Sequence, residues 1–396
     1  MAAGSIKRRR YTREDGTIRE TWRARHPDPT RGGAHKIEKQ FRTKREAERW
    51  LTEQRAAAQR GDWINPADGA RTFSQVAGEW RQTWADLEPK TRAGYESLLG
   101  QLENRFGKAK VGSLHTDALQ SYFNELAERR AANTVRRYFT VLSQVMRVAV
   151  ERRYIGANPC DSVRLPKRRG AKQEHLFLMP HEVAALADAI DPHWRVAIYT
   201  AAYTGVRAGE LWALRRKRLD LLHGTLRIEE SLKDVSGHLM FGLPKSEASH
   251  RTISLPGSIR EMLEDHLSQP APGGSGPDDL VFTTPTGLPV RHGLFYRRIF
   301  KPAVERALPP GKHGLRFHDL RHTCASLLLA VAPNPYAVMK RLGHEDIKTT
   351  INTYGHLFPD VDAALAGELD GMLVAAEMGA DTFVSAAVHT MARPAS

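Results

Sequence analysis

The amino-acid sequence predicts a multidomain protein that is mainly α-helical and contains small β-sheets. Its 396 residues suffice for two or three domains, each with a core of its own. Apolar residues repeat at helical spacing through residues 72–163, whereas short alternating segments bounded by turn residues occupy residues 1–65 and part of 176–357. We therefore expect a small α+β module, a helical domain and a mixed α+β domain, in that order.

The charge of the chain favours a polyanionic partner. The net charge is +14 and the isoelectric point is near 9.9, although residues 357–396 hold six acidic residues and one arginine. Nucleic acid is the first candidate and an anionic membrane surface the second. Because no run of 18 apolar residues occurs, we expect no membrane anchor. Cys160 and Cys324 lie far apart, which favours a reducing cytoplasm and gives no indication of a metal site.

Residues 1–65 predict three strands and a helix. SIKRRRYTRE and TIRETWRARH flank the turn Asp15–Gly16, KIEKQFRT forms the third strand, and Thr43 with Glu46 makes a capping box for the helix. The basic residues of this module predict a contact with DNA phosphates, the alternative being an ordinary solvated surface. The candidates on the first strand are Lys7, Arg8, Arg9 and Arg10.

Residues 72–163 predict an all-helical domain that follows a turn-rich boundary at 61–71. Two stripes of apolar residues at helical spacing are expected to form the hydrophobic core of this domain. They consist of Tyr95, Leu98, Leu99, Leu102 and Phe106, and of Val135, Phe139, Leu142, Met146 and Ala149. The polar faces carry possible phosphate contacts, for which a solvated face is an equal alternative. These residues are Arg92, Arg136 and Arg137.

Residues 164–175 predict an extended linker, because they combine proline, glycine and basic residues without any period. Lys167, Arg168 and Arg169 would contact the DNA backbone there. Residues 176–357 then predict a mixed domain. Helices are expected from Pro180 and over 192–204, and TLRIEES, HLMFGLPK and HRTISLP are expected to form one small antiparallel sheet. Residues 358–396 form a tail with an amphipathic stripe.

The residues that carry chemistry begin in the stretch HDLRHTCASLLLAVAPNPYAVMKRLGHEDIKTTINTYGHL. His318 and Arg321 are three apart, so on a helix they would share a face. His344 follows in LGH and Tyr354 in NTYGH. A guanidinium, two imidazoles and a phenol make a set suited to a phosphodiester.

Two upstream motifs add a second arginine and a lysine. In TGVRAGEL, Arg207 follows a turn and Glu210 lies three residues on, where it can orient the guanidinium. In LPKSEASHRTISLP, Lys245 ends one strand and HRTISL begins the next; Lys233 is the nearest competitor. Each residue taken singly has an ordinary structural explanation, such as a surface ion pair or a core aromatic.

Taken together and in this order, the six residues resemble the signature of the tyrosine recombinases, the phage-integrase family. The resemblance implies an arm-type DNA-binding domain over 1–65, a core-binding (SAM-like) domain over 72–163 and a catalytic domain over 176–357. It also implies that the tail, 358–396, docks on a neighbouring protomer, the alternative being a helix that caps its own domain. The catalytic residues would be Arg207, Lys245, His318, Arg321, His344 and Tyr354, supported by Glu210.

The resemblance also implies a mechanism without metal, cofactor or ATP. Tyr354 would be the nucleophile and His318 its base, while Arg207, Arg321 and His344 would hold the phosphate oxygens. Lys245 would protonate the departing 5′-oxygen. The product would be a 3′-phosphotyrosine, resolved through a Holliday junction.

An integrase of a phage or mobile element is the leading functional prediction. Its partners would be double-stranded DNA attachment sites, three further copies in a tetramer and an accessory directionality factor or excisionase. Its location would be the cytoplasm of a bacterial host, at the nucleoid. The alternatives are a chromosome-dimer-resolving recombinase, a type IB topoisomerase-like enzyme and a non-enzymatic DNA-binding regulator.

Overall fold

The computed structural model describes residues 4–12, 18–29, 35–60, 63–65, 67–166, 176–244, 246–331, 334–354, 367 and 369–374. The chain divides into two compact units, Met1–Lys172 and Gln173–Ser396. No helix in the described part of the chain is long and apolar enough to cross a membrane.

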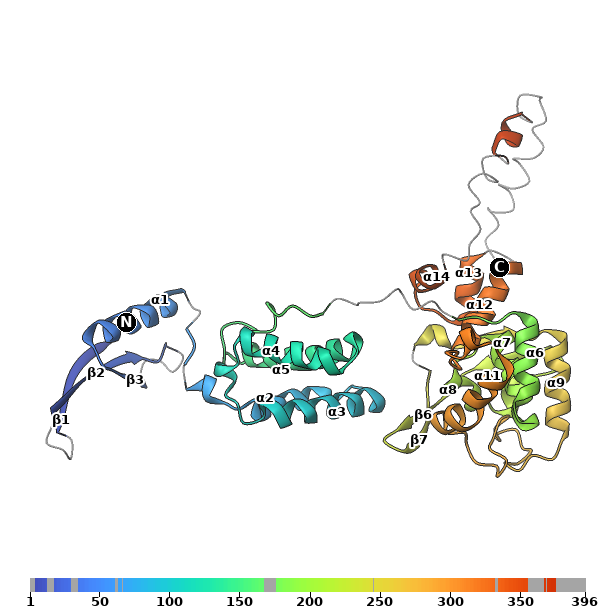
Figure 1. Cartoon of the computed structure of the whole chain (residues 1–396), viewed down its shortest axis with the longest axis horizontal. Helices are drawn as coiled ribbons and strands as arrows, with labels where there is room; N and C mark the ends of the chain where they lie inside the picture. Colours follow the sequence, from blue (N-terminus) through green and yellow to red (C-terminus); the bar gives the residue numbers. More distant parts are fainter. Residues whose placement is uncertain are drawn as a thin grey trace. The chain divides into compact units, whose positions relative to one another are not determined.

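The N-terminal module is a three-stranded antiparallel sheet covered by one helix (Figure 1). The elements are β1 (Ser5–Thr12), β2 (Ile18–Pro27), β3 (Lys36–Phe41) and α1 (Lys44–Arg60), in the sheet order β1-β2-β3. The predicted capping box is present, since the Thr43 amide donates to Glu46 and the Glu46 amide to Thr43, both over 3.2 Å. The core forms where Ala47, Trp50 and Leu51 of α1 pack on the sheet.

The four basic residues of β1 are divided between the two faces of this sheet. Ile6 belongs to the core under α1, so strand alternation places Arg8 and Arg10 on the same face and Lys7 and Arg9 on the other. Arg8 and Arg10 both bind the carboxylate of Glu20. The predicted DNA contacts of this strand therefore belong to two chemically different surfaces.

The second module is helical, as expected. It contains α2 (Phe73–Arg81), α3 (Pro89–Phe106), α4 (Thr116–Arg129) and α5 (Ala132–Glu151). All ten apolar-stripe positions contribute to the core of this module: eight are buried in it, and Tyr95 and Phe139 pack against it as partly buried side chains. The predicted phosphate contacts Arg92, Arg136 and Arg137 are exposed, whereas Lys167, Arg168 and Arg169 lie outside the described residues.

The C-terminal unit is a helical domain edged by two small sheets. Its helices are α6 (Pro180–Ala189), α7 (Pro192–Thr204), α8 (Ala208–Trp212), α9 (Gly257–Ser268), α10 (His292–Phe295), α11 (Lys301–Ala307), α12 (Asp319–Val331), α13 (Pro335–Leu342) and α14 (Ile347–Tyr354). A π-helical turn, Tyr296–Phe300, joins α10 to α11. The core is continuous from Leu178 to Leu320 and centres on α7, whose apolar residues contact both α6 and α12.

The strands of this domain differ from the single sheet that we expected. They are β4 (Leu219–Asp220), β5 (Thr225–Ile228), β6 (Ser231–Val235), β7 (His238–Gly242) and β8 (Arg251–Ser254). β4, β5 and β8 form one sheet, while β6 and β7 form a separate hairpin. The segment TLRIEES is split between β5 and β6, because the chain leaves the first sheet at Glu229 and Glu230, which pair with Arg218 and Arg215.

The tail lies mostly outside the described residues. Of its predicted apolar stripe, Leu369 and Met372 are described, and both are exposed.

Candidate active site

Arg207 lies at the N-terminal end of α8, as its motif predicts. Its side chain donates from Nη1 to Glu210 Oε1 over 2.8 Å and from Nη2 to the Gly343 carbonyl over 3.0 Å. Nη1 also reaches the Ser249 hydroxyl, at 3.2 Å. The Arg207 amide donates to the second oxygen of Glu210. Glu210 is buried and pairs with the guanidinium, whereas one third of the Arg207 side chain remains exposed.

Arg321 is the buried counterpart of Arg207. It lies in the first turn of α12 with only 2% of its surface exposed, and its Nη1 and Nη2 donate to the carbonyls of Gly205 at 2.7 Å and Leu342 at 2.5 Å. Burial and the nearby Arg207 lower the pKa of this guanidinium to about 9, so it remains charged at neutral pH. The two arginines are thus fixed by elements more than a hundred residues apart.

Two glycines allow the turns from which these arginines are held. Gly205 ends α7 at φ +68° and Gly343 ends α13 at φ +67°, both in the left-handed region that favours glycine. A Cβ on Gly205 would lie 2.5 Å from the Leu342 side chain, and one on Gly343 would lie 2.8 Å from the Ala248 carbonyl. The glycines of TGVR and LGH are therefore required by both conformation and space. The Gly205 carbonyl binds Arg321 and the Gly343 carbonyl binds Arg207, so each arginine braces the turn beside the other motif.

The two predicted histidines are neutral at physiological pH. His344 follows the Gly343 turn, and its Nδ1 contacts the Thr350 hydroxyl at 2.8 Å. Burial, followed by the charges of Arg321 and Arg207, lowers its pKa to about 3. His318 keeps an exposed surface, but burial of the rest of its imidazole and the charge of Arg321 lower its pKa to about 4. Both imidazoles can therefore donate or accept a hydrogen bond without carrying a charge.

His318 is not inside the helix, contrary to the spacing argument. α12 begins at Asp319, and His318 occupies the turn before it, with its carbonyl accepting from the Arg321 amide at 3.0 Å. The reason is that the Asp319 carboxylate accepts from the Arg316 amide at 2.7 Å and so ties down the turn that precedes the helix.

Tyr354 ends α14 and is buried, with 2% of its surface exposed. Its hydroxyl contacts Nδ1 of His322 at 2.8 Å, and it packs with Ala325, Leu329 and Val338. Burial raises the pKa of the phenol above its ordinary value, although the charge of Arg321 acts in the opposite direction.

His322 is a residue of the site that the predicted catalytic set does not include. The structure places His322, and not His318, against the Tyr354 hydroxyl. His318 contacts His322, and the centroids of the two imidazole rings are 5.2 Å apart. The position of His322 in the motif HDLRHT, four residues after His318 and one after Arg321, was the available signal.

The predicted lysine, Lys245, lies outside the described residues. The turn Glu247–Ser249 begins two residues after it, and the Ser249 hydroxyl contacts Arg207. The competitor Lys233 lies in β6, away from that turn in the chain.

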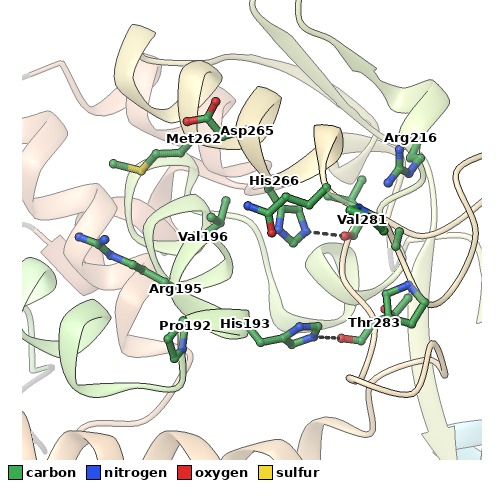
Figure 2. A pocket seen from close by; sticks show the side chains of 14 residues that line it. Pro192, His193, Arg195, Val196, Arg216, Met262, Asp265, His266, Val281 and Thr283 are labelled. Atoms are coloured by element: carbon green, nitrogen blue, oxygen red, sulfur yellow. Dashed lines mark hydrogen bonds between the residues drawn. The ribbon is translucent and has the colours of Figure 1, made fainter.

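A cavity of about 390 Å³ lies at the opposite end of α7 from Arg207 and shares no residue with the site. Figure 2 shows two of its histidines with one ring nitrogen each engaged by the backbone: Nε2 of His193 contacts the Thr283 carbonyl at 2.7 Å, and Nε2 of His266 contacts the Val281 carbonyl at 2.9 Å. No group of three or more histidine, cysteine or acidic side chains that could hold a metal ion occurs among the residues for which coordinates are described.

Comparison with known families accounts for most of both units. Residues 177–360 match the phage integrase family, and residues 73–165 match the phage integrase central domain. The chain belongs to the phage integrase family. This family comprises the tyrosine recombinases, which break and rejoin DNA, so the chain is an enzyme of that class.

Individual relatives of this tyrosine recombinase match more than two thirds of its length. The integrase of Mycobacterium phage L5 is 28% identical over 359 residues, covering 86% of this chain and 90% of the relative. The ICEBs1 integrase of Bacillus subtilis strain 168 is 28% identical over 283 residues, covering 69% of this chain and 75% of the relative. Among solved structures, the Tn1549 transposon integrase in complex with a circular intermediate DNA aligns with a TM-score of 0.65 and 20% identity, over 76% of this chain and 99% of that chain. That structure supports the recombinase fold.

The lowered pKa of His344 predicts a pH dependence of stability. Below the ordinary histidine pKa of about 6.5, the unfolded chain takes up a proton that folded His344 does not bind, so the free energy of unfolding falls as the pH falls towards about 3. A fully shielded group contributes at most about 1.4 kcal/mol per pH unit. Chemical unfolding at pH 7.0 and pH 5.5 should show a smaller difference for His344→Asn than for the wild type. An unchanged or larger difference would contradict this assignment.

Proposed function

We propose that this tyrosine recombinase is the integrase of a phage or another mobile element, and that it cuts DNA with Tyr354. The observation that carries the proposal is the arrangement of Arg207 and Arg321: Arg207 is held by the Gly343 turn, and Arg321 by the Gly205 turn. Two fixed guanidiniums can bind the nonbridging oxygens of a phosphodiester bidentately and stabilise the charge that grows there during attack. His344 is neutral and follows the Gly343 turn, and it can donate a further hydrogen bond to the phosphate.

The proposed step transfers the DNA strand from a 5′-oxygen to the protein. The Tyr354 hydroxyl loses its proton, its oxygen bonds to phosphorus, and the bond from phosphorus to the 5′-oxygen breaks. Lys245 gives a proton to that departing oxygen. The result is a 3′-phosphotyrosine and a free 5′-hydroxyl, with the phosphoester bond retained, so rejoining requires no ATP.

The proton of Tyr354 has a nearer acceptor than the one that the motif suggested. His322 contacts the phenol directly, and its Nε2 faces the Asp319 carboxylate at 4.0 Å. A proton on Nε2, facing that carboxylate, leaves Nδ1 to accept the phenolic proton. We therefore assign the role of base to His322. His318 would instead bind the phosphate, together with Arg207 and Arg321.

The DNA partner and the assembly are also part of the proposal. A structural neighbour, a lambda integrase tetramer bound to a Holliday junction, aligns with a TM-score of 0.54 and 18% identity, over 89% of this chain and 95% of that chain. By analogy this chain would act as a tetramer on paired attachment sites. The exposed Lys7 and Arg9 of β1, and Arg92, Arg136 and Arg137 of the helical module, would contact DNA phosphates. A directionality factor or excisionase would set the direction.

A recombination assay with two DNA molecules, each carrying one attachment site, tests the function. We expect recombinant product from the full chain without added Mg²⁺ or ATP. A variant that lacks residues 358–396 should bind a single site as the full chain does but form no recombinant, because the tail is proposed to join neighbouring protomers. Relaxation of a plasmid with no requirement for a second site would instead indicate a topoisomerase. Full recombination by the truncated chain would contradict the role of the tail.

A further inference from the structure

Arg251 is a buried cation that the predicted catalytic set does not include. It begins β8, two residues after Ser249 and six after Lys245. Only 6% of its side chain is exposed, compared with 33% for Arg207. A buried guanidinium needs several partners, because its desolvation must be offset.

The partners of Arg251 come from three different parts of the site. Nη2 donates to Glu210 Oε2 over 2.9 Å, Nη1 to the Ser249 carbonyl over 3.0 Å, and Nε to the Arg341 carbonyl over 2.8 Å. Glu210 holds Arg207, Ser249 belongs to the turn after Lys245, and Arg341 lies in the last turn of α13 before His344. One side chain thus joins the three segments that carry the upstream arginine, the lysine and the downstream histidine.

The turn before His344 is closed directly over this side chain. A Cβ placed on Gly343 would lie 3.1 Å from both Cδ and Nη1 of Arg251. The Gly343 carbonyl, in turn, accepts from Arg207. The position of that carbonyl, and with it one of the hydrogen bonds that orient Arg207, therefore depends on the space occupied by Arg251.

Electrostatics couples Arg251 to Arg207 through Glu210. Burial alone would raise the pKa of the Glu210 carboxyl, but the charge and hydrogen bond of Arg251, followed by those of Arg207, keep that pKa below its ordinary value. Arg251 is therefore the stronger of the two partners that keep Glu210 ionised. Without it, the buried carboxylate would have Arg207 as its main counter-charge and would compete with a phosphate for the same guanidinium.

We propose that Arg251 is a positioning residue for strand cleavage: it shares Glu210 with Arg207 and fixes the Gly343 turn, so that Arg207 faces the scissile phosphate. This inference rests on the proposed function. Arg251 does not touch the phosphate. Removing the Arg251 side chain should lower the cleavage rate in the same way as removing Arg207, because the negative charge on the nonbridging oxygens is then less well stabilised.

A neutral substrate separates this role from a merely structural one. A methylphosphonate at the scissile position carries no negative charge, so its cleavage depends less on a well-placed guanidinium. Strand cleavage is measured as release of the 5′-hydroxyl strand from a nicked suicide DNA, with the phosphodiester and with the methylphosphonate. The proteins compared are the wild type, Arg251→Met, Arg251→Lys and Arg207→Ala, all as full chains. Arg218→Met serves as a matched control, because Arg218 forms a part-buried ion pair with Glu229 in the same domain.

We expect Arg251→Met to cleave the phosphodiester about 100-fold more slowly than the wild type. Its methylphosphonate-to-phosphodiester rate ratio should rise at least about tenfold, as it should for Arg207→Ala. Arg251→Lys should fall between wild type and Arg251→Met, because it retains the charge but has one nitrogen in place of the three that bind the separate partners of Arg251. Arg218→Met should match the wild type. Equal losses on both substrates, or no loss, would overturn the proposal.

Folding and the underlying function are controlled separately. If Arg251→Met does not fold, the double variant Arg251→Met with Glu210→Gln leaves no unpaired buried carboxylate and takes its place in the same two-substrate assay. A ratio in the double variant that stays at the wild-type value would count against the positioning role. Failure of the proposed function looks different: the wild type would cleave neither substrate, or Arg207→Ala would retain the wild-type rate on the phosphodiester.

Discussion

A Tyr354→Phe variant is expected to form no covalent adduct with a nicked suicide DNA, whereas the wild type accumulates one. The phenol oxygen is the proposed nucleophile, and phenylalanine keeps the ring while removing only that atom. The adduct rate should therefore fall below about one-thousandth of the wild-type rate. The measurement is a denaturing gel on which DNA labelled upstream of the scissile phosphate migrates with the protein, in the absence of added Mg²⁺.

The fold should survive this change, because the Tyr354 ring packs in a small apolar cluster that phenylalanine can fill. The lost hydroxyl leaves Nδ1 of His322 without that partner, at a cost of about 1–3 kcal/mol. Tyr336→Phe is the matched control, since Tyr336 is an exposed tyrosine on α13, and it should form the adduct normally. An adduct that persists in Tyr354→Phe would overturn the assignment of the nucleophile.

The base can be tested with the same DNA. His322→Asn retains a hydrogen-bonding group for the phenol but cannot take up its proton, so adduct formation should slow by about 10²–10⁴-fold. His318→Asn should slow the reaction through the phosphate instead. Wild-type cleavage by His322→Asn would return the role of base to His318, as the motif suggested.

The sequence predicted those parts of the site that short-range rules control. Glu210 lies three residues from Arg207 and forms the expected ion pair, because that spacing at a helix start brings the two side chains together. The glycines of TGVR and LGH mark helix ends that need a left-handed residue. Family resemblance supplied the set of residues, but the physical reason for each turn is visible in the sequence itself.

Other parts depend on contacts between distant segments, which no local pattern contains. The exchange of carbonyl contacts between the Gly205 and Gly343 turns joins residues that are more than a hundred positions apart. The contact of His322 with Tyr354 depends on how α14 packs on α12. From the sequence, Arg251 could be predicted only to lie in a strand, because its burial and its three partners follow from tertiary packing. The division of the strands into two sheets has the same origin.

Arg321→Lys should reduce adduct formation by about 10²–10³-fold, the loss associated with removing one fixed donor from a site that stabilises developing negative charge. The geometry makes this substitution severe although it keeps the charge. Arg321 spans the carbonyls of Gly205 and Leu342 with two different nitrogens, at 2.7 Å and 2.5 Å. A lysine ammonium is a single point that cannot bind both carbonyls and still present a planar pair of donors to a phosphate.

Arg321→Lys should reduce the rate of adduct formation more than it reduces the stability of the fold. Lysine can retain the bond to one carbonyl, which leaves the other buried acceptor unpaired and costs about 1–3 kcal/mol of stability, whereas a 10²–10³-fold loss of rate corresponds to about 3–4 kcal/mol of transition-state stabilisation. Thermal unfolding and single-turnover adduct formation, measured on one preparation, separate the two. Arg316→Lys, on an arginine whose side chain is half exposed and paired with Asp319, is the control and should change neither much. If Arg321→Lys unfolds normally and cleaves within about threefold of the wild type, then the buried arginine braces the two glycine turns without acting on the phosphate, and Arg207 alone must carry the charge stabilisation.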